Sequence, residues 1–413
     1  MISRSFRWLW MSSGLSNIGD GVTLVGVSLI AVTLTRSPLL VSLVSTAATL
    51  PWLLLTLHAG ALADRHDRRR IMAVSNGARA GVLAAMILAA WSGVLNLPVL
   101  LAGALLLGVA EVFADTSAQS ILPMVVPRNQ LADANGKLIA VQTVGNNFLG
   151  APLAGILTGI GAAATLGAPA LLYAAAGLAL LGMRGRFHVE APSTRTLRAD
   201  IADGLRYLWD HRVLRALSIF AGVLNLANAA YFAVFVLWVV GEESRVGLPP
   251  SGYGLIAAAL ALGAVAGSLL AEKLSHRAGQ VRTLITADLV NSILLLVPVF
   301  LPTAVAIGVT AALLGATNAI SNVVLVSLRQ RIVPEELLGR VHATIRLIGM
   351  GATPLGAAVG GFLGVRVGLP AVFCTAAALC VIAVALVSRP VTGRSVAEAE
   401  RAAQPAEALK ETA

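Results

Sequence analysis

Apolar runs of about 20 residues, separated by short polar stretches, recur along all 413 residues of the chain. A run of this length is what a helix needs to cross the hydrocarbon core of a bilayer. The pattern therefore predicts an all-α integral membrane protein with twelve transmembrane helices. Their expected positions are residues 8–34, 39–62, 71–92, 97–122, 137–160, 163–184, 213–240, 251–273, 283–301, 303–328, 341–365 and 369–388.

The composition supports a membrane protein. Only 12% of the residues are charged and 57% are hydrophobic, whereas a soluble domain has about 25% charged residues. Both cysteines, Cys374 and Cys380, fall in the last apolar run and are expected to be small core residues rather than a disulfide framework. The first run has no small-residue cleavage site, which indicates an uncleaved helix rather than a signal peptide.

Basic residues gather on one side of the predicted helices. The loops expected on the outer side hold only Arg36, Arg245 and Arg366, and positive loops stay cytoplasmic. This bias predicts a multi-pass protein of the plasma (inner) membrane with both termini in the cytoplasm. The net charge of +10 does not indicate a nucleic-acid partner, because that would need a basic face on a soluble domain.

The chain also repeats itself. Residues 127–131 resemble residues 334–338, and residues 149–157 resemble residues 355–363, each about 207 residues later. The repeat predicts two six-helix halves, 1–184 and 213–390, joined by a cytoplasmic linker, 185–212. A polar, Ala/Glu-rich cytoplasmic tail, 391–413, is expected to be mobile.

A charged hairpin between the second and third spans, residues 60–70, reads Gly-x-Leu-Ala-Asp-Arg-x-x-Arg-Arg over its first ten positions. It resembles the signature loop of the major facilitator superfamily, which usually has Gly where Asp67 stands. The resemblance implies a gating loop, in which Gly60 packs closely, Asp64 holds a partner and the arginines contact inner loops or anionic headgroups. These arginines are Arg65, Arg68, Arg69 and Arg70.

Two more segments extend the resemblance. Residues 122–135 are similar to the link between helices four and five in the branch of macrolide-efflux and enterobactin-type exporters, and residues 203–211 to the stretch that opens its second half. Residues 150–155 resemble the Gly-Pro motif of helix five in proton-coupled exporters, shortened here. No Lys or Arg lies between Arg79 and Arg128, so the basic residue that many drug exporters carry in helix four is absent. Their proton relay cannot be transferred to this chain.

Ionisable residues inside the spans are the candidate transport chemistry, because a charge at a helix centre costs roughly 2.5–3.5 kcal/mol. At 1.5 Å per residue, Asp20 and Glu111 both lie about 18 Å deep, and neither has a basic residue in its own span. They are expected to form a proton and cation site. Arg79 and Asp115 share a depth, which predicts an ion pair. The alternative is that the acids only hydrogen-bond between helices, and Asp288 is expected near the inner surface as a loop or cap partner.

Uncharged polar residues recur at helical spacing in several spans, and glycines form separate stripes. The polar stripes either line a wet cavity or bridge helices, and the sequence leaves both open. The polar set is Asn17, Gln142, Asn146, Asn225, Asn228, Asn318 and Asn322, and the expected packing set is Gly150, Pro152, Gly155, Gly356 and Gly360.

No catalytic or metal-binding motif stands out. The chain lacks a Walker loop, a Gly-x-Ser-x-Gly and a His-Glu-x-x-His, so no enzyme, cofactor or metal is expected. The resemblance implies a monomeric secondary transporter that exports an amphipathic organic compound (drug, macrolide or siderophore-like) against proton entry. The alternatives are an importer or uniporter of a small nutrient, and a non-transporting membrane protein or intramembrane enzyme.

Overall fold

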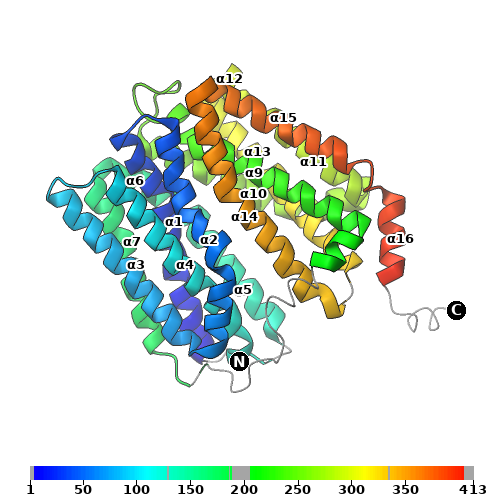
Figure 1. Ribbon diagram of the computed structural model, residues 1–413, viewed down its shortest axis with the longest axis horizontal. Coiled ribbons are helices and arrows are strands. Elements are labelled where there is room, and N and C mark those ends of the chain that lie inside the picture. Colours follow the sequence, from blue (N-terminus) through cyan, green and yellow to red (C-terminus); the bar gives the residue numbers. More distant parts are fainter. Residues whose placement is uncertain (1–3, 128–129, 186, 188–204, 334, 404–413) are drawn as a thin grey trace. The chain divides into compact units, whose positions relative to one another are not determined.

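The computed structural model describes residues 4–127, 130–185, 187, 205–333 and 335–403. Its elements are helices, labelled in Figure 1, and a single isolated β-bridge, Val240–Leu248, is recorded among these residues. The elements are α1 (Arg4–Leu34), α2 (Pro38–Arg65), α3 (Arg68–Trp91), α4 (Leu97–Val125), α5 (Leu131–Thr143), η2 (Val144–Gly150), α6 (Ala151–Ile160), α7 (Ala162–Leu181), α9 (Arg212–Val239), α10 (Pro250–Ala278), α11 (Gln280–Leu294), α12 (Val297–Phe300), α13 (Ala304–Ile332), α14 (Glu335–Val367), α15 (Leu369–Val387) and α16 (Gly393–Ala403).

Eleven segments in the described part of the chain are long and apolar enough to cross a membrane. Each coincides within a few residues with an expected span, so the all-α membrane class is confirmed. The expected span at 137–160 is the exception, because three consecutive helical elements, α5, η2 and α6, occupy it.

Local chemistry sets many helix ends. Asn96 accepts a hydrogen bond from the N–H of Val99 at the start of α4, and Thr303 does the same for Ala306 at the start of α13. The chain reverses between α10 and α11 at Gly279 (φ 82°) and between α14 and α15 at Gly368 (φ 86°). Glycine adopts these left-handed angles without the steric penalty of a Cβ.

The segment η2 is a π-helix, a rare element that is frequent at functional sites. The N–H of Ala151 donates to the carbonyl of Asn146, five residues earlier. Pro152 comes next and has no N–H to donate, which favours such an irregularity. The π-helix lies against α1 so closely that a Cβ on Gly150 would stand 2.6 Å from the Cα of Gly21. The two backbones therefore touch without intervening side chains.

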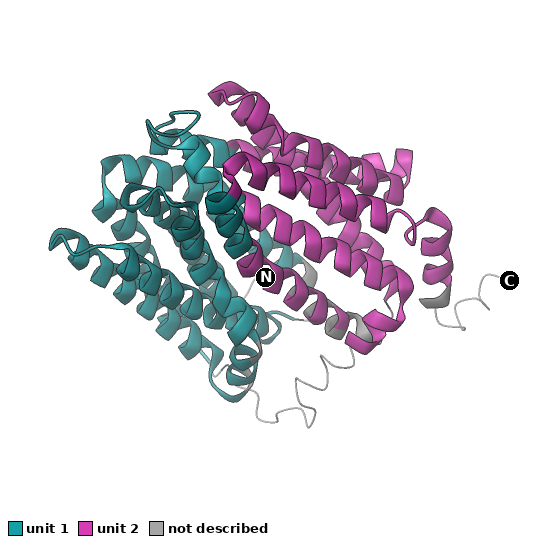
Figure 2. Cartoon of the chain, turned by 45° about the horizontal axis from the view of Figure 1, so that its top comes forward, with its two compact units in different colours: residues 1–194, 232–258, 357–366 teal, residues 195–231, 259–356, 367–413 magenta. Residues whose placement is uncertain are grey.

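Contacts divide the chain into two compact units, coloured in Figure 2. Unit 1 comprises residues 1–194, 232–258 and 357–366, and unit 2 comprises residues 195–231, 259–356 and 367–413. Unit 1 thus contains the end of α9, the start of α10 and part of α14 besides the first seven α-helices. The predicted halves, 1–184 and 213–390, stay a prediction.

Close approaches inside unit 1 explain why it recruits these later segments. A Cβ on Gly155 of α6 would stand 2.7 Å from the carbonyl oxygen of Pro250 and 3.0 Å from the Cα of Gly254 in α10. Arg36, after α1, donates to the carbonyl of Val240 at 2.8 Å and lies 3.8 Å from the carboxylate of Glu243.

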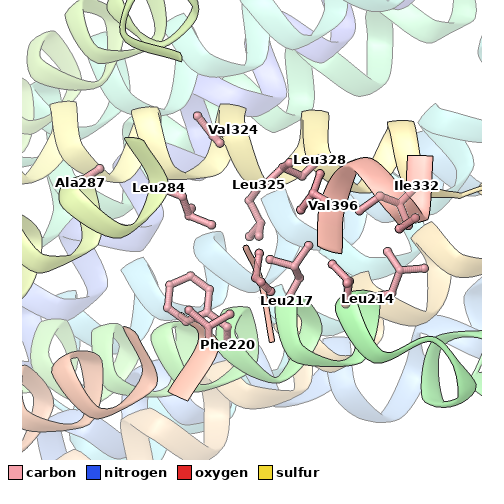
Figure 3. Close-up of a cluster of buried hydrophobic side chains, with 14 of the residues drawn as sticks. Leu214, Leu217, Phe220, Leu284, Ala287, Val324, Leu325, Leu328, Ile332 and Val396 are labelled. Carbon is pink, nitrogen blue, oxygen red and sulfur yellow. The ribbon is translucent and has the colours of Figure 1, made fainter. Parts of the chain in front are cut away.

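Unit 2 is built around a large apolar cluster to which α9, α10, α11, α13, α14, α15 and α16 contribute (Figure 3). The last helix, α16, contributes Val396 and Ala399 to this cluster, and its Glu400 lies 3.8 Å from Arg331 of α13. The expectation of a mobile tail is therefore wrong for Gly393–Ala403, because an apolar stripe holds this segment on the unit. Residues 404–413 and most of the linker, 186 and 188–204, lie outside the described residues.

Candidate transport site

Three ionisable residues lie at the middle of long helices in unit 1. Asp20 is at the centre of α1, Arg79 at the centre of α3 and Glu111 at the centre of α4. Helices of 24 to 31 residues are long enough to cross a bilayer. These charges are consequently as far from both helix ends as the fold allows.

Asp20 and Arg79 form a buried ion pair. The Nη1 atom of Arg79 lies 3.0 Å from Oδ1 of Asp20, and the side chains are 1% and 14% exposed, respectively. The same Nη1 atom donates to Ser16 Oγ at 3.0 Å, and this hydroxyl donates to Asn76 Oδ1 at 3.3 Å. The guanidinium is thus held by α1 on one side and tied back to α3 through Ser16.

Tyr173 of α7 completes the network. Its hydroxyl donates to the same oxygen, Asp20 Oδ1, at 2.8 Å, and Thr23 Oγ1 lies 3.3 Å from that hydroxyl. The guanidinium carbon of Arg79 lies 5.0 Å from the centre of the tyrosine ring, within cation–π range. One buried side chain therefore supports both members of the ion pair.

Arg79 keeps unused hydrogen-bonding capacity. Its Nε and Nη2 atoms are buried and have no hydrogen-bond partner in the described part of the chain. Glu111 and Asp115, which lie one turn apart on α4, are both within electrostatic range of the guanidinium. The site thus places one cation among three carboxylates on two other helices.

The structure gives Arg79 a direct partner that the sequence analysis did not pair with it. Arg79 pairs with Asp20, which is therefore compensated by a cation, and Asp115 is within electrostatic range of the same guanidinium, so the predicted Arg79–Asp115 pair stays a prediction. The prediction measured depth from expected helix ends, but α1 begins at Arg4 and α3 at Arg68, several residues before the positions assumed. An arginine side chain also reaches across about one helical turn, so matched depth of the backbone does not identify its partner.

Sequence reasoning missed Tyr173 and Asn76. Tyr173 stands alone in the Ala/Leu-rich helix α7, and it is only 2% exposed. A buried tyrosine usually finds a partner for its hydroxyl. That rule could have marked Tyr173 as a candidate, but it could not have named Asp20 as the acceptor.

The amide side chains predicted to line a cavity fall into two groups. Asn17 and Asn228 donate to carbonyls one turn earlier in their own helices, at 2.7 Å and 3.0 Å, and Asn146 Oδ1 is buried without a partner among the described residues. The others are exposed side chains within the helices: Gln142, Asn225, Asn318 and Asn322. The exposed group satisfies its polar atoms only where water or a polar ligand can reach it.

Comparison with known proteins places the chain in a family. The model of the transmembrane secretion effector family, a branch of the major facilitator superfamily, matches residues 1–411. This chain belongs to that family. The resemblance to the superfamily and to its exporter branch is thus confirmed, as is the prediction of a transporter rather than an enzyme.

Curated relatives cover nearly the whole chain. The multidrug efflux pump Tap of Mycobacterium tuberculosis is 30% identical over 390 residues, which are 90% of this chain and 89% of Tap. The enterobactin exporter EntS of Citrobacter koseri is 25% identical over 87% of this chain and 85% of EntS.

Solved structures share the fold. The nucleoside transporter NupG has a TM-score of 0.75 at 14% identity, with 93% of this chain and 98% of NupG covered. A bacterial homologue of the iron transporter ferroportin, in an inward-facing state, has a TM-score of 0.74 at 16% identity, with 94% and 98% covered.

The hairpin between α2 and α3 is the segment that resembles the superfamily's signature loop. Asp67, which replaces the usual glycine, caps α3 by accepting from the N–H groups of Arg69 (2.9 Å) and Arg70 (3.3 Å). It also accepts from the N–H of Phe187 at 3.5 Å, while the N–H of Arg68 donates to the carbonyl of Phe187 at 3.1 Å. Asp67 therefore links the hairpin to the segment that follows α7.

Two arginines of this hairpin contact protein groups, and two are exposed. Arg68 is buried and its Nη1 lies 3.3 Å from Sδ of Met124, while Arg69 Nη1 donates to the carbonyl of Met183 at 2.6 Å. Arg65 and Arg70 are exposed. Gly60 lies in the last two turns of α2, and the side chain of Asp64 lies outside the described residues.

The expected packing glycines sit at several helix contacts. Gly150 of η2 packs against α1, and Gly155 of α6 packs against α10, as described above. Gly356 of α14 lies against the carbonyl of Leu226 in α9. Pro152 follows the π-helix, and Gly360 is buried in α14.

Proposed function

We propose that this transporter is a proton-coupled exporter of amphipathic organic compounds. The names of its relatives, a multidrug efflux pump and an enterobactin exporter, favour export and an organic substrate of the drug, macrolide or siderophore-like class. Both relatives align over most of their length, so the likeness extends to the whole transport unit.

The Asp20–Arg79 ion pair is the observation that best supports the proposed proton coupling. An ionised Asp20 attracts the guanidinium, and a proton on Asp20 removes that attraction. Arg79 then has other anionic partners in Glu111 and Asp115, and two of its nitrogen atoms are unused among the described residues. Proton binding would thus exchange one arrangement of α1, α3 and α4 for another. Coupling requires two such arrangements with different proton affinity.

The polar side chains within the helices favour neutral or cationic lipophilic substrates. Exposed amides such as Asn225 and Asn318 offer hydrogen bonds without charge, and the partly exposed Glu111 offers a negative group. A cationic substrate would compete with the proton for the carboxylates. Binding of one would then favour release of the other.

We further infer that the chain has twelve spans, with α5, η2 and α6 acting together as the fifth. The halves would be 1–184 and 213–390, working by alternating access. The basic loops favour cytoplasmic termini, linker and tail in the inner membrane. A monomer suffices for this mechanism.

Everted membrane vesicles test the proposal. Dyes and macrolides should accumulate in vesicles containing the protein when the lumen is acidic, and should not when the gradient is collapsed. Asp20→Asn and Glu111→Gln mimic the protonated acids, so at least one variant should still exchange substrate across the membrane without concentrating it. Full gradient-driven accumulation in both single variants and in the double variant would refute the coupling role, and gradient-driven loss from the lumen would indicate import.

A further inference from the structure

Unit 2 contains a buried carboxylate, Asp288, that the transport site does not use. It lies inside α11 and is 4% exposed. The expectation of a loop or cap partner near the surface is therefore wrong, because α11 begins at Gln280, two turns before Asp288. Ser321 of α13 donates to its Oδ2 at 2.8 Å.

The groups that face Asp288 are neutral. From α13 comes Ser321, and from α15 comes the buried thiol of Cys380, which is close enough for electrostatic interaction. The charged residues Arg329 and Arg331 lie about 12 Å or more farther along α13, and Arg329 donates to the carbonyl of Leu217. Within the described chain no cation pairs with Asp288, in contrast to Asp20.

An unpaired, buried carboxylate is far more stable in its neutral form, because moving an isolated charge out of water is very costly. The protonated acid can also donate a hydrogen bond, whereas the ionised one can only accept. Both properties are typical of a carboxyl group that binds a proton. A route to water decides whether the proton can exchange.

Such a route begins at a cavity in unit 2. The cavity has a volume of about 950 Å³ and is formed by α10, α11, α13 and the α15–α16 segment. Charged side chains line it, with His276 lying 3.6 Å from Glu272, Arg331 lying 3.8 Å from Glu400, and Arg282 exposed. Charged walls of this kind favour hydration of the cavity.

Two residues that line the cavity lie near Asp288 and Ser321 along their helices. Ile285 and Val324 line it, and they lie one helical turn from Asp288 and Ser321, respectively. Leu284 and Ala287 of α11 belong to the same apolar cluster as Val324 and Leu325 of α13 (Figure 3). The residues that line the cavity are thus sequence neighbours, one turn away, of the carboxylate and of its hydrogen-bond donor.

We propose that Asp288 is a proton-binding site of the transporter, loaded and unloaded through this cavity. A proton passes from cavity water to the carboxylate, and the return step gives it back to water. The inference does not rest on the proposed function, since it assigns proton binding in unit 2 irrespective of how unit 1 works.

Infrared spectroscopy of the full chain in lipid nanodiscs, without substrate or gradient, tests the assignment. The spectrum should contain a protonated-carboxyl C=O band that is lost in Asp288→Asn, persists in Asp20→Asn and disappears reversibly as the pH is raised. Ser321→Ala, a milder change, should shift the frequency of the band. An unchanged spectrum in Asp288→Asn, or a band that ignores bulk pH, would overturn the proposal. If Asp288→Asn does not fold, Ser321→Ala decides: a band that does not shift overturns it equally.

Hydrogen–deuterium exchange of the same band tests the route. Ile285→Ala removes part of the apolar lining of the cavity and should accelerate the exchange. Leu289→Ala is the matched control, because Leu289 is on the same helix but is exposed and does not line the cavity. Equal exchange rates in the two variants would rule out access through this cavity.

Discussion

Arg79 and Asp20 are 59 residues apart in the sequence, yet Nη1 of one lies 3.0 Å from Oδ1 of the other at the centre of two long helices. The pair joins α3 to α1, and Tyr173 joins α7 to the same oxygen. A single carboxylate oxygen therefore connects three helices of unit 1, and any change in its charge acts on all three.

The first prediction concerns the energetics of this pair. Asp20→Ala leaves a buried guanidinium without its direct partner and should destabilise the protein by about 3–5 kcal/mol. The double change Asp20→Ala with Arg79→Ala removes both charges and should be more stable than the worse single variant. Thermal unfolding in detergent, followed by size-exclusion chromatography with fluorescence detection, measures the order. A double variant less stable than both single variants would contradict the pairing.

The second prediction concerns the tyrosine hydroxyl. Tyr173→Phe keeps the ring beside Arg79 but removes the donor to Asp20, a hydrogen bond to a charged group worth about 1.5–3 kcal/mol. We expect lower thermal stability and weaker gradient-driven accumulation in vesicles. Tyr253→Phe is the control, since Tyr253 lies on α10 and makes none of the hydrogen bonds described for the Asp20 network. Equal losses in the two variants would show that the contact with Asp20 has no special role.

The third prediction concerns the signature loop. Asp67→Ala removes the cap of α3 and the acceptor for Phe187, and the cap alone is worth about 1 kcal/mol. Asp67→Asn keeps an acceptor oxygen and should be nearly as stable as the original chain. Melting temperatures of the two variants in the same detergent test this. If both variants lose the same stability, the negative charge rather than the cap is what matters.

The fourth prediction concerns pH. Burial lowers the pKa of His211 below its usual 6.5, and its Nδ1 accepts from the N–H of Leu214 at the start of α9. The folded state favours the neutral ring, so this contribution to stability is present above the unfolded pKa, about 6.5. It is lost as the pH falls through the lower, folded pKa.

His211→Asn supplies an acceptor that does not titrate in this range and serves as the comparison. The melting temperature of the original chain should fall more than that of His211→Asn between about pH 8 and about pH 5. Parallel curves for the two proteins would remove His211 as the cause.

Hydropathy could predict the helices because burial in lipid requires long apolar runs, and Leu97–Val125 and Leu369–Val387 begin where expected. It could also find the ionisable residues, because they are rare in such runs. It could not predict that Arg79 turns toward Asp20, since the rotation of each helix depends on packing with its neighbours. For the same reason the sequence places Asp288 near the surface, because it gives the distance of this residue from the loop but not the helices that bury it.

The π-helix illustrates a different limit. The motif around Pro152 pointed to a special position, and Gly150 and Gly155 do lie at close approaches. The change of hydrogen-bond register at Ala151 does not alter the spacing of apolar residues, because the π-helix adds no polar residue to the sequence. Hydropathy therefore cannot detect it. Backbone irregularities of this kind are specified by the neighbour they accommodate, here the glycine-bearing face of α1.

The contact of Gly155 with Pro250 and Gly254 is made of backbone on both sides. Interlocked side chains would have to change rotamers before two helices could slide or turn, and each change would add friction to the motion. A contact between two backbones has no interlocked side chains, so α6 and α10 could shift relative to each other without rotamer changes. A bulky side chain at this contact would push the two helices apart and should slow transport of every substrate.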